Sequence, residues 1–250
     1  MDEGTGPARH IEAGGRPSRL LGPEDGHTWQ PDEITALTPD ESAARGLLGP
    51  VPDDWRTYEA LELPPILQGA LTAFATNGYR GSTVRDIASR VGMTVPAIYY
   101  HYRNKQDLLA TLIFASIIDV LERCKAAVAG AGGSRKAQLS SLTECIVLYM
   151  AHRRHLAFLD NEIRSLEPEH YTRYIEYRDE LQNLLRRIIA SGCKEGVFGT
   201  PHPRETSLAI LAMCQGVALW YRPDGPLTPE QIAHRYSVVA LDAARFVAVR

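Results

Sequence analysis

The sequence predicts an all-α protein in which a three-helix helix-turn-helix domain precedes a larger helical domain. Two observations predict this fold. After Leu63, apolar residues recur at three- and four-residue steps, as in amphipathic helices, without the alternation that marks strands. Near the start of this region, two short helical segments are joined by a glycine turn. A chain of 250 residues can bury a sizeable core around such helices.

The first 60 residues differ in composition from the rest of the chain. They contain 8 Gly and 7 Pro, and 12 acidic residues against 5 Arg, which gives a net charge of −7. Because the whole chain carries −3, residues 61–250 carry +4. We therefore expect residues 1–60 to be an acidic, disordered leader, with a short helix possible over residues 40–48. The leader is either a solvated tail or a segment whose acidity competes for the basic region.

The first helix of the globular part has a single apolar stripe. Gly78 is expected to end this helix in a left-handed conformation, just before Tyr79. The residues of the stripe, spaced by three and four, are Ile66, Leu67, Ala70, Leu71, Phe74 and Ala75.

Two short helices follow directly. Thr83 can cap the first of them, and Asp86, three residues later, can reach back to the N–H of the cap. Gly92 supplies the left-handed residue for a sharp exit. Thr94 can cap the next helix, and Pro96 falls in its first turn, where a missing N–H has no intrahelical partner to lose.

Residues 66–109 read ILQGALTAFATNGYRGSTVRDIASRVGMTVPAIYYHYRNKQDLL. This segment resembles the DNA-binding domain of the TetR family of transcriptional regulators. It keeps the family spacing at Gly78-Tyr79, in TVRDIA at residues 83–88, at the Gly92 turn and in IYYHY at residues 98–102. The resemblance implies a DNA-binding domain at residues 61–108 and a helical effector-binding and dimerisation domain at residues 109–250.

Local charge points to DNA independently of the resemblance. Between Arg80 and Lys105 the chain has five basic residues against one acid, Asp86, although the protein as a whole is acidic. A local positive excess suits the phosphate backbone, because counterion release supplies much of the affinity for DNA.

Helical phase divides the residues of the recognition helix. Ile98 and Tyr102, four apart, are expected in the core. At Val95, many family members carry a hydrogen-bonding side chain, so we expect readout here to depend on apolar contact and DNA shape. The resemblance places Thr94, Val95, Pro96, Ala97 and Tyr100 near the bases and Thr83, Tyr99, His101 and Lys105 at phosphates, and Arg85 from the basic segment completes the expected DNA-binding set.

The remaining sequence predicts helices without interruption. Asn104 can cap a long helix whose apolar stripe reaches Val128 and ends at the glycines of residues 130–134. In the TetR family this helix links the DNA reader to the ligand domain. Further helices are expected at residues 135–151, 155–165, 168–191, 203–221 and 228–249.

The last two predicted helices carry apolar or small residues on more than one face. This holds for residues 207–221 and for the final helix around Tyr236 and Val239. Such a helix is either deeply buried or shared with a partner. The resemblance implies a four-helix bundle across a two-fold axis, and hence a homodimer that binds palindromic half-sites.

A small-molecule effector is expected in the C-terminal domain. The segments at residues 148–171 and 216–236 resemble a TetR subgroup associated with acyl-CoA-type effectors, in which arginines would hold an anionic head. Taken singly, each of these arginines could equally form a surface ion pair. The candidate effector-binding residues are Arg153, Arg154, Asn161, Arg164, Gln215 and Trp220.

Several protein classes are disfavoured. No run approaches the roughly 20 apolar residues of a membrane span, and the acidic N-terminus is no secretory signal, so we expect a cytoplasmic protein. Neither a cofactor nor a metal is expected, since His152 and His155 lack an evident third ligand. The cysteines form no C-x-x-C pair and are expected to be reduced structural thiols; they are Cys124, Cys145, Cys193 and Cys214.

The sequence therefore indicates a ligand-responsive regulator, more specifically a repressor released from its operator by a small molecule. The alternatives are a helical enzyme or an interaction scaffold with a vestigial helix-turn-helix. An enzyme is not expected, because no motif such as G-x-S-x-G or a phosphate loop frames the residues that could serve it. Those residues are Ser140, Cys145, Asp160, Glu162 and His170.

Overall fold

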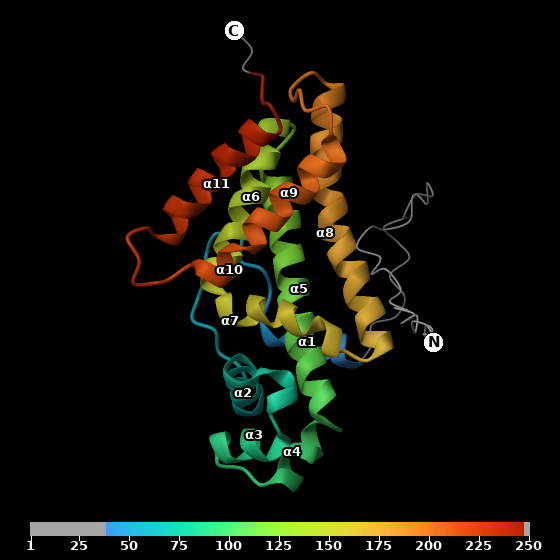
Figure 1. The fold of residues 1–250 in the computed structure, drawn as a ribbon, viewed down its shortest axis with the longest axis vertical. Coiled ribbons are helices and arrows are strands. Elements are labelled where there is room, and N and C mark those ends of the chain that lie inside the picture. The colour runs from blue at the N-terminus through green and yellow to red at the C-terminus, as the bar shows by residue number, and fades with distance from the viewer. Residues whose placement is uncertain (1–38, 248–250) are drawn as a thin grey trace, which may run out of the picture. The chain divides into compact units, whose positions relative to one another are not determined.

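The computed structural model describes residues 39–247, and the regular elements in this range are helices (Figure 1). The all-α prediction is confirmed. No helix among these residues is long and apolar enough to cross a membrane. In chain order the elements are α1 (Pro39–Leu47), α2 (Pro65–Gly81), α3 (Val84–Val91), α4 (Val95–His101), α5 (Lys105–Gly130), α6 (Arg135–His152), α7 (Arg154–Ala157), the 3-10 helix η1 (Phe158–Ser165), α8 (Pro168–Lys194), α9 (Pro203–Gln215), α10 (Val217–Trp220) and α11 (Pro229–Ala243).

Helices α2, α3 and α4 form the predicted helix-turn-helix. At the start of α3, the Asp86 N–H donates to the Thr83 hydroxyl at 3.2 Å, and the Thr83 N–H donates back to the Asp86 carboxylate at 2.9 Å. Gly92 then turns the chain with a φ of 67°. Thr94 caps α4, and Ile98, 1% exposed, fixes α4 to the core. Local capping and turn chemistry therefore set the geometry of this unit.

Helix α5 is the axis of the helical body. All residues from Gln106 to Leu121 are buried, so neighbours cover this helix on every side. Helices α1, α6 and α8 pack along it, and α2 packs against it near the helix-turn-helix (Figure 1). Because α5 continues through residue 108, the expected boundary between the two domains falls inside one helix, and the described residues 39–247 lie within one compact unit.

The leader prediction is wrong from residue 39 onward. Helix α1 packs on α5, which confirms the short helix expected near residues 40–48, and Trp55 is only 6% exposed. The Gly and Pro content hid this order, because a segment can pack on an existing helical surface without building a core of its own. We call residues 51–63, between α1 and α2, the N-terminal strap. Residues 1–38 of the expected leader lie outside the described residues.

Three predicted helices have different boundaries. The segment at residues 155–165 consists of the short α7 followed by η1, and the helix expected at residues 203–221 is interrupted at Gly216. Glycine is a poor helix former, which accounts for the second break. The last helix ends at Ala243, because Arg245 takes a φ of 53° and Phe246 then pairs with Phe198 in an isolated antiparallel bridge.

Candidate functional site

The expected base-reading residues lie together on the exposed side of α4. Thr94 and Pro96 are exposed, Val95 and Ala97 are half-buried, and Tyr100 is 86% exposed. The Thr94 hydroxyl accepts from the Ala97 N–H at 3.3 Å, so its first role is to cap α4. An exposed tyrosine on a short, fixed helix is available to a base edge or a thymine methyl group.

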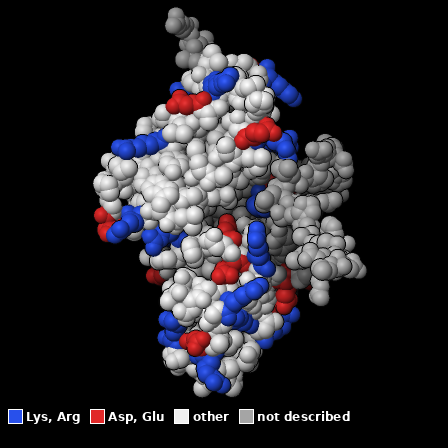
Figure 2. All heavy atoms as spheres, in the orientation of Figure 1, with Lys and Arg blue, Asp and Glu red and all other residues white. Residues whose placement is uncertain are grey.

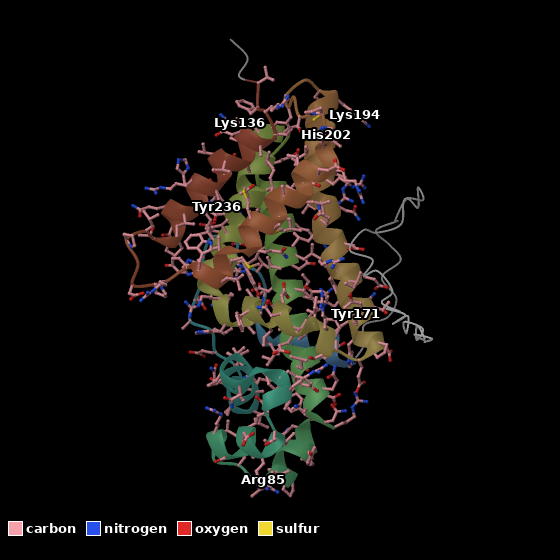
Figure 3. The ribbon with its side chains drawn as sticks, in the orientation of Figure 1. Arg85, Lys136, Tyr171, Lys194, His202 and Tyr236 are labelled. Carbon is pink, nitrogen blue, oxygen red and sulfur yellow. The ribbon has the colours of Figure 1, made fainter. Side chains whose placement is uncertain are left out.

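The residues expected at phosphates are arranged around this face. Tyr99 is 50% exposed, and His101 packs its ring edge-on against Tyr100, with 5.2 Å between centroids. Thr83 and Arg85 are exposed at the start of α3, and Arg85 lies at the outer end of the helix-turn-helix (Figure 3). Hydrogen bonds from Thr83 lower the pKa of Asp86, which keeps that carboxylate charged and bound to the cap.

Lys105, expected at a phosphate, makes contacts inside the protein. Its Nζ donates to the carbonyl oxygens of Tyr79 and Ser82, both at 2.8 Å, and lies 4.1 Å from the centroid of the Tyr79 ring. Those carbonyls stand at the end of α2, where cations are favoured. Lys105 therefore ties the end of α2 to the start of α5, and two of its three protons are used inside the protein.

A hydrogen-bonded joint connects the helix-turn-helix to η1. The Tyr79 N–H donates to Glu162 Oε1 at 3.0 Å, and the Tyr79 hydroxyl donates to Gln106 Oε1 at 2.8 Å. The Gln106 amide in turn donates to the Ser165 carbonyl at 3.1 Å. Gly78, with a φ of 71°, leaves room for Glu162, whose Oε1 lies 3.3 Å from the place where a β-carbon would stand. We call Tyr79, Gln106, Glu162 and Ser165 the η1 joint.

The expected effector-binding residues are not brought into one site. Arg153 Nη1 donates to the Glu59 carbonyl at 2.8 Å, and Arg154 Nη1 donates to the Tyr221 carbonyl at 2.9 Å. Arg164 is exposed, and Trp220 is 50% exposed. The arginines at these positions therefore do not form one cluster around a ligand head group. The guanidiniums of Arg153 and Arg154 bind backbone carbonyls instead.

Asn161 and Gln215 do share a cavity. Its volume is about 380 Å³, within the range of small-ligand sites, and η1, α6, α8, α9 and α10 line it. Its polar groups include Asp160, Tyr174 and Arg178. Burial raises the pKa of Asp160 to about 6, while the Tyr174 hydroxyl and Arg178 act in the opposite direction. No local pattern in the sequence connected Tyr174 and Arg178, roughly two and three helical turns into α8, with this site.

A second cavity, of about 820 Å³, lies between α1, residues 48–51 and α5. Small side chains such as Ala115 and Ala126 leave space there, and Asp119, Glu122 and Lys125 contribute charge. No sequence pattern indicated this cavity, because the short helix expected near residues 40–48 carried no sign that it packs on α5.

A buried polar cluster lies under the N-terminal strap. Arg123 Nε donates to Asp119 Oδ1 at 3.0 Å, and Arg123 Nη1 donates to the carbonyls of Trp55 and Thr57, both at 2.9 Å. The Tyr58 ring lies 4.3 Å from the Arg123 guanidinium. The Tyr58 ring also stacks on the His152 ring, with 4.5 Å between centroids, and its centroid lies 5.5 Å from the Arg153 guanidinium. We call Asp119, Arg123 and Arg153 the buried arginine cluster.

Known protein families match most of the described chain. The model described as "Bacterial regulatory proteins, tetR family" matches residues 66–112, and the model described as "Tetracyclin repressor-like, C-terminal domain" matches residues 132–244. Together they cover more than half of the sequence. The chain belongs to the TetR family. TetR-family proteins are regulators, so membership of the family points away from an enzyme. Helix α1 and the N-terminal strap precede both matched regions.

Individual TetR-family relatives agree with this membership. The transcriptional repressor KstR2 of Rhodococcus jostii is 27% identical over 195 residues, which is 77% of this chain and 96% of KstR2. A tetR-family regulatory protein from Rhodococcus RHA1 has a similar structure, with 29% identity, a TM-score of 0.67, and coverage of 74% of this chain and 97% of its own. The structure of AibR with isovaleryl coenzyme A and operator DNA has a TM-score of 0.62 over 73% of this chain and 97% of AibR; at 20% identity it supports the fold.

Proposed function

We propose that this TetR-family protein is a homodimeric transcriptional repressor that leaves a palindromic operator when a small molecule binds its helical body. The η1 joint carries the proposal. Asp160 and Asn161 of η1 line the smaller cavity, while Glu162, next in the chain, accepts the Tyr79 N–H of the helix-turn-helix. A ligand that moves η1 therefore acts on the DNA reader through one residue, at a coupling of about 1 to 3 kcal/mol.

DNA reading is divided between two groups of side chains. Tyr100, Pro96 and Ala97 on the outer side of α4 meet base edges by apolar contact, and Thr94 supplies the hydroxyl at the N-terminus of α4. Thr83, Arg85, Tyr99 and His101 hold phosphates on either side. Lys105 is assigned a positioning role, since it orients α2 against α5.

The dimer interface is proposed to involve α9 and α11. On α11, Val238 is 45% and Val239 is 50% exposed, and Leu219 of α10 is 67% exposed. In Figure 2 the surface over these helices shows few charged side chains. A large exposed apolar surface marks a protein interface, and two-fold pairing places two copies of α4 on successive half-sites.

The effector is proposed to be an anionic molecule with an apolar part, and acyl-CoA thioesters are the first candidates. The complex of the fold neighbour AibR with isovaleryl coenzyme A supports this choice. Since Arg153 and Arg154 hold backbone carbonyls, the donors that the smaller cavity offers to an anion are Arg178, Asn161 and Gln215, beside Tyr174 and the carboxyl group of Asp160.

A gel-shift titration tests the proposal. DNA flanking the coding region of this protein is titrated at low salt, and then again with octanoyl-CoA, octanoate or octan-1-ol. We expect retardation by the protein alone and release by an anionic octanoyl compound. No retardation at low salt would contradict DNA binding, and release by octan-1-ol alone would contradict the anionic effector.

A further inference from the structure

The N-terminal strap is held by two buried arginines, which would bind an anion more strongly than they bind the strap. Arg123 and Arg153 are 4% and 9% exposed, and they donate to three strap carbonyls, those of Trp55, Thr57 and Glu59. A buried guanidinium is expected to pair with an anion, because a neutral carbonyl offsets little of the cost of removing its charge from water. Three carbonyl oxygens therefore stand where anionic oxygens would bind more strongly.

The charge of the buried arginine cluster is not balanced by its described side chains. Two guanidiniums face one carboxylate, that of Asp119, whose side chain is 6% exposed. Burial raises the pKa of Asp119 in spite of both arginines, so its negative charge is itself disfavoured. The cluster as described has an excess of positive charge in a place that is largely buried.

Hydrogen bonding under the strap is also incomplete. Among side chains of the described residues, Asp119 Oδ2, Arg153 Nε and the Tyr58 hydroxyl are buried without a hydrogen-bond partner. Each such atom has lost its bonds to water without gaining a bond in the protein, which destabilises the folded state. Three of them in one cluster indicate that the strap fills this site without satisfying it.

The strap leads directly into the DNA reader. Figure 1 shows it as the blue loop between α1 and α2. It ends at Leu63, and α2 of the helix-turn-helix begins at Pro65. A change in the position of the strap is therefore passed to the first helix of the DNA-binding unit.

We propose that the buried arginine cluster is the anion subsite of an effector and that the N-terminal strap occupies it in the ligand-free protein. The carbonyls of the strap stand in for carboxylate or phosphate oxygens, and the Tyr58 ring, between Arg123 and His152, stands in for an apolar group of the ligand. The ligand class is an amphipathic anion that binds Arg123 and Arg153 and displaces the strap. This inference rests on the proposed function for the role of the effector, and it assigns the anionic part of that ligand to the buried arginine cluster in place of the polar groups of the smaller cavity.

Calorimetric titration of the full chain without DNA tests the site. The probes share one chain length and differ in the head group: octanoate, octanoyl-CoA and octan-1-ol. We expect one or both anions to bind and octan-1-ol not to bind; octanoate identifies a carboxylate ligand, and octanoyl-CoA alone identifies phosphate groups. Equal binding of octan-1-ol, or binding of no probe, would overturn the inference.

Two substitutions with opposite expected effects separate the strap from the subsite. Tyr58→Ala loosens the strap, so anion affinity should rise at least about tenfold, since less of the protein is held closed. Arg153→Gln removes one guanidinium and should abolish anion binding. The matched controls, Tyr171→Ala on α8 and Arg222→Gln after α10, should change neither, because both residues are exposed and lie outside the cluster. Unchanged affinity in Tyr58→Ala would contradict occupation by the strap.

Hydrogen exchange keeps the test independent of variant stability. In the wild-type protein, anion binding should speed amide exchange in residues 51–63, whereas protection of these amides would show that the strap stays in place and would overturn the inference. If the anion binds and frees the strap without changing DNA affinity, the proposed function fails and the subsite stands. If DNA is bound and released by a ligand that leaves exchange in the strap unchanged, the subsite fails and the proposed function stands.

Discussion

The Tyr79 N–H donates to Glu162 Oε1 across 83 residues of sequence, at a distance of 3.0 Å. This bond joins the last turn of α2 to η1, which lines the smaller cavity. A charge-assisted bond of this kind is worth about 1.5 to 3 kcal/mol, enough to set the position of a small domain.

Gly78→Ala should weaken this joint. A β-carbon at Gly78 would stand 3.3 Å from Glu162 Oε1 at a φ of 71°, so we expect a loss of stability of about 1 to 3 kcal/mol and a reduced effector response in gel shifts. Urea denaturation measures the first effect. Gly81→Ala is the matched control, since its β-carbon would meet the Asn77 β-carbon at an ordinary 3.7 Å. Since alanine is the better helix former, helix propensity alone would give no loss in either variant, and equal losses in both would show that contact with the joint is not responsible.

Tyr100→Ala and Arg85→Ala should affect DNA binding in different ways. Loss of the 86% exposed Tyr100 ring should change the preference among operator sequences with little effect on the salt dependence. Loss of Arg85 should weaken binding to all sequences and reduce the salt slope by about 1. Anisotropy titrations at several salt concentrations measure both, and Arg222→Ala, far from α4 in the chain, serves as the charge control. Sequence-blind losses of equal size in both variants would contradict the division of roles.

Asp160→Asn should stabilise the protein at pH 8 and much less at pH 4. The pKa of Asp160 is raised from 3.8 to about 6 in the folded protein, so the folded state holds this proton more tightly than the unfolded state. The stability contributed by the protonated carboxyl is present below pH 3.8 and is lost as the pH rises through about 6. Urea denaturation at the two pH values measures the difference. Asp242→Asn, an exposed position on α11, is the control, and a gain that does not vary with pH would count against burial as the cause.

Val239→Glu should convert the protein to a monomer at micromolar concentrations and abolish tight operator binding. Val239 is 50% exposed on α11, and a charge at its position would be buried by a partner. Sedimentation velocity gives the oligomeric state. Tyr171→Glu introduces the same charge on α8, away from Tyr236 and α11 in Figure 3, and should leave the dimer intact. A dimeric Val239→Glu variant would move the interface elsewhere.

Local features of the site were predictable from sequence, and long-range ones were not. The helix-turn-helix and its exposed face could be placed because its caps and turn are set by nearby sequence. These local signals are the caps at Thr83 and Thr94 and the left-handed Gly92. The partners of Lys105 lie 23 and 26 residues away, and a lysine near a DNA reader looks like a phosphate ligand until they are known.

The contacts of the expected effector residues were hidden from the sequence for the same physical reason. Arginines among apolar residues indicate an anion site, and Arg153 is indeed buried, but its bond to the Glu59 carbonyl spans 94 residues. Composition concealed the partner segment, because the Gly and Pro content of residues 1–60 as a whole masked residues 51–63, which contain no Gly and one Pro and supply carbonyls and one tyrosine to a surface that is already formed.

Helix α5 also fixes the phase between ligand site and DNA reader. Gln106 at its start belongs to the η1 joint, and Arg123, further along, holds the N-terminal strap. Since each residue of an α-helix turns the chain by about 100°, inserting one alanine between these positions would rotate one end against the other by that angle, whereas seven residues would nearly restore it. Helix α5 thus fixes the rotation of the DNA-binding domain relative to the helical body. Chimaeras that exchange DNA-binding domains between such proteins must therefore keep the number of residues in this helix.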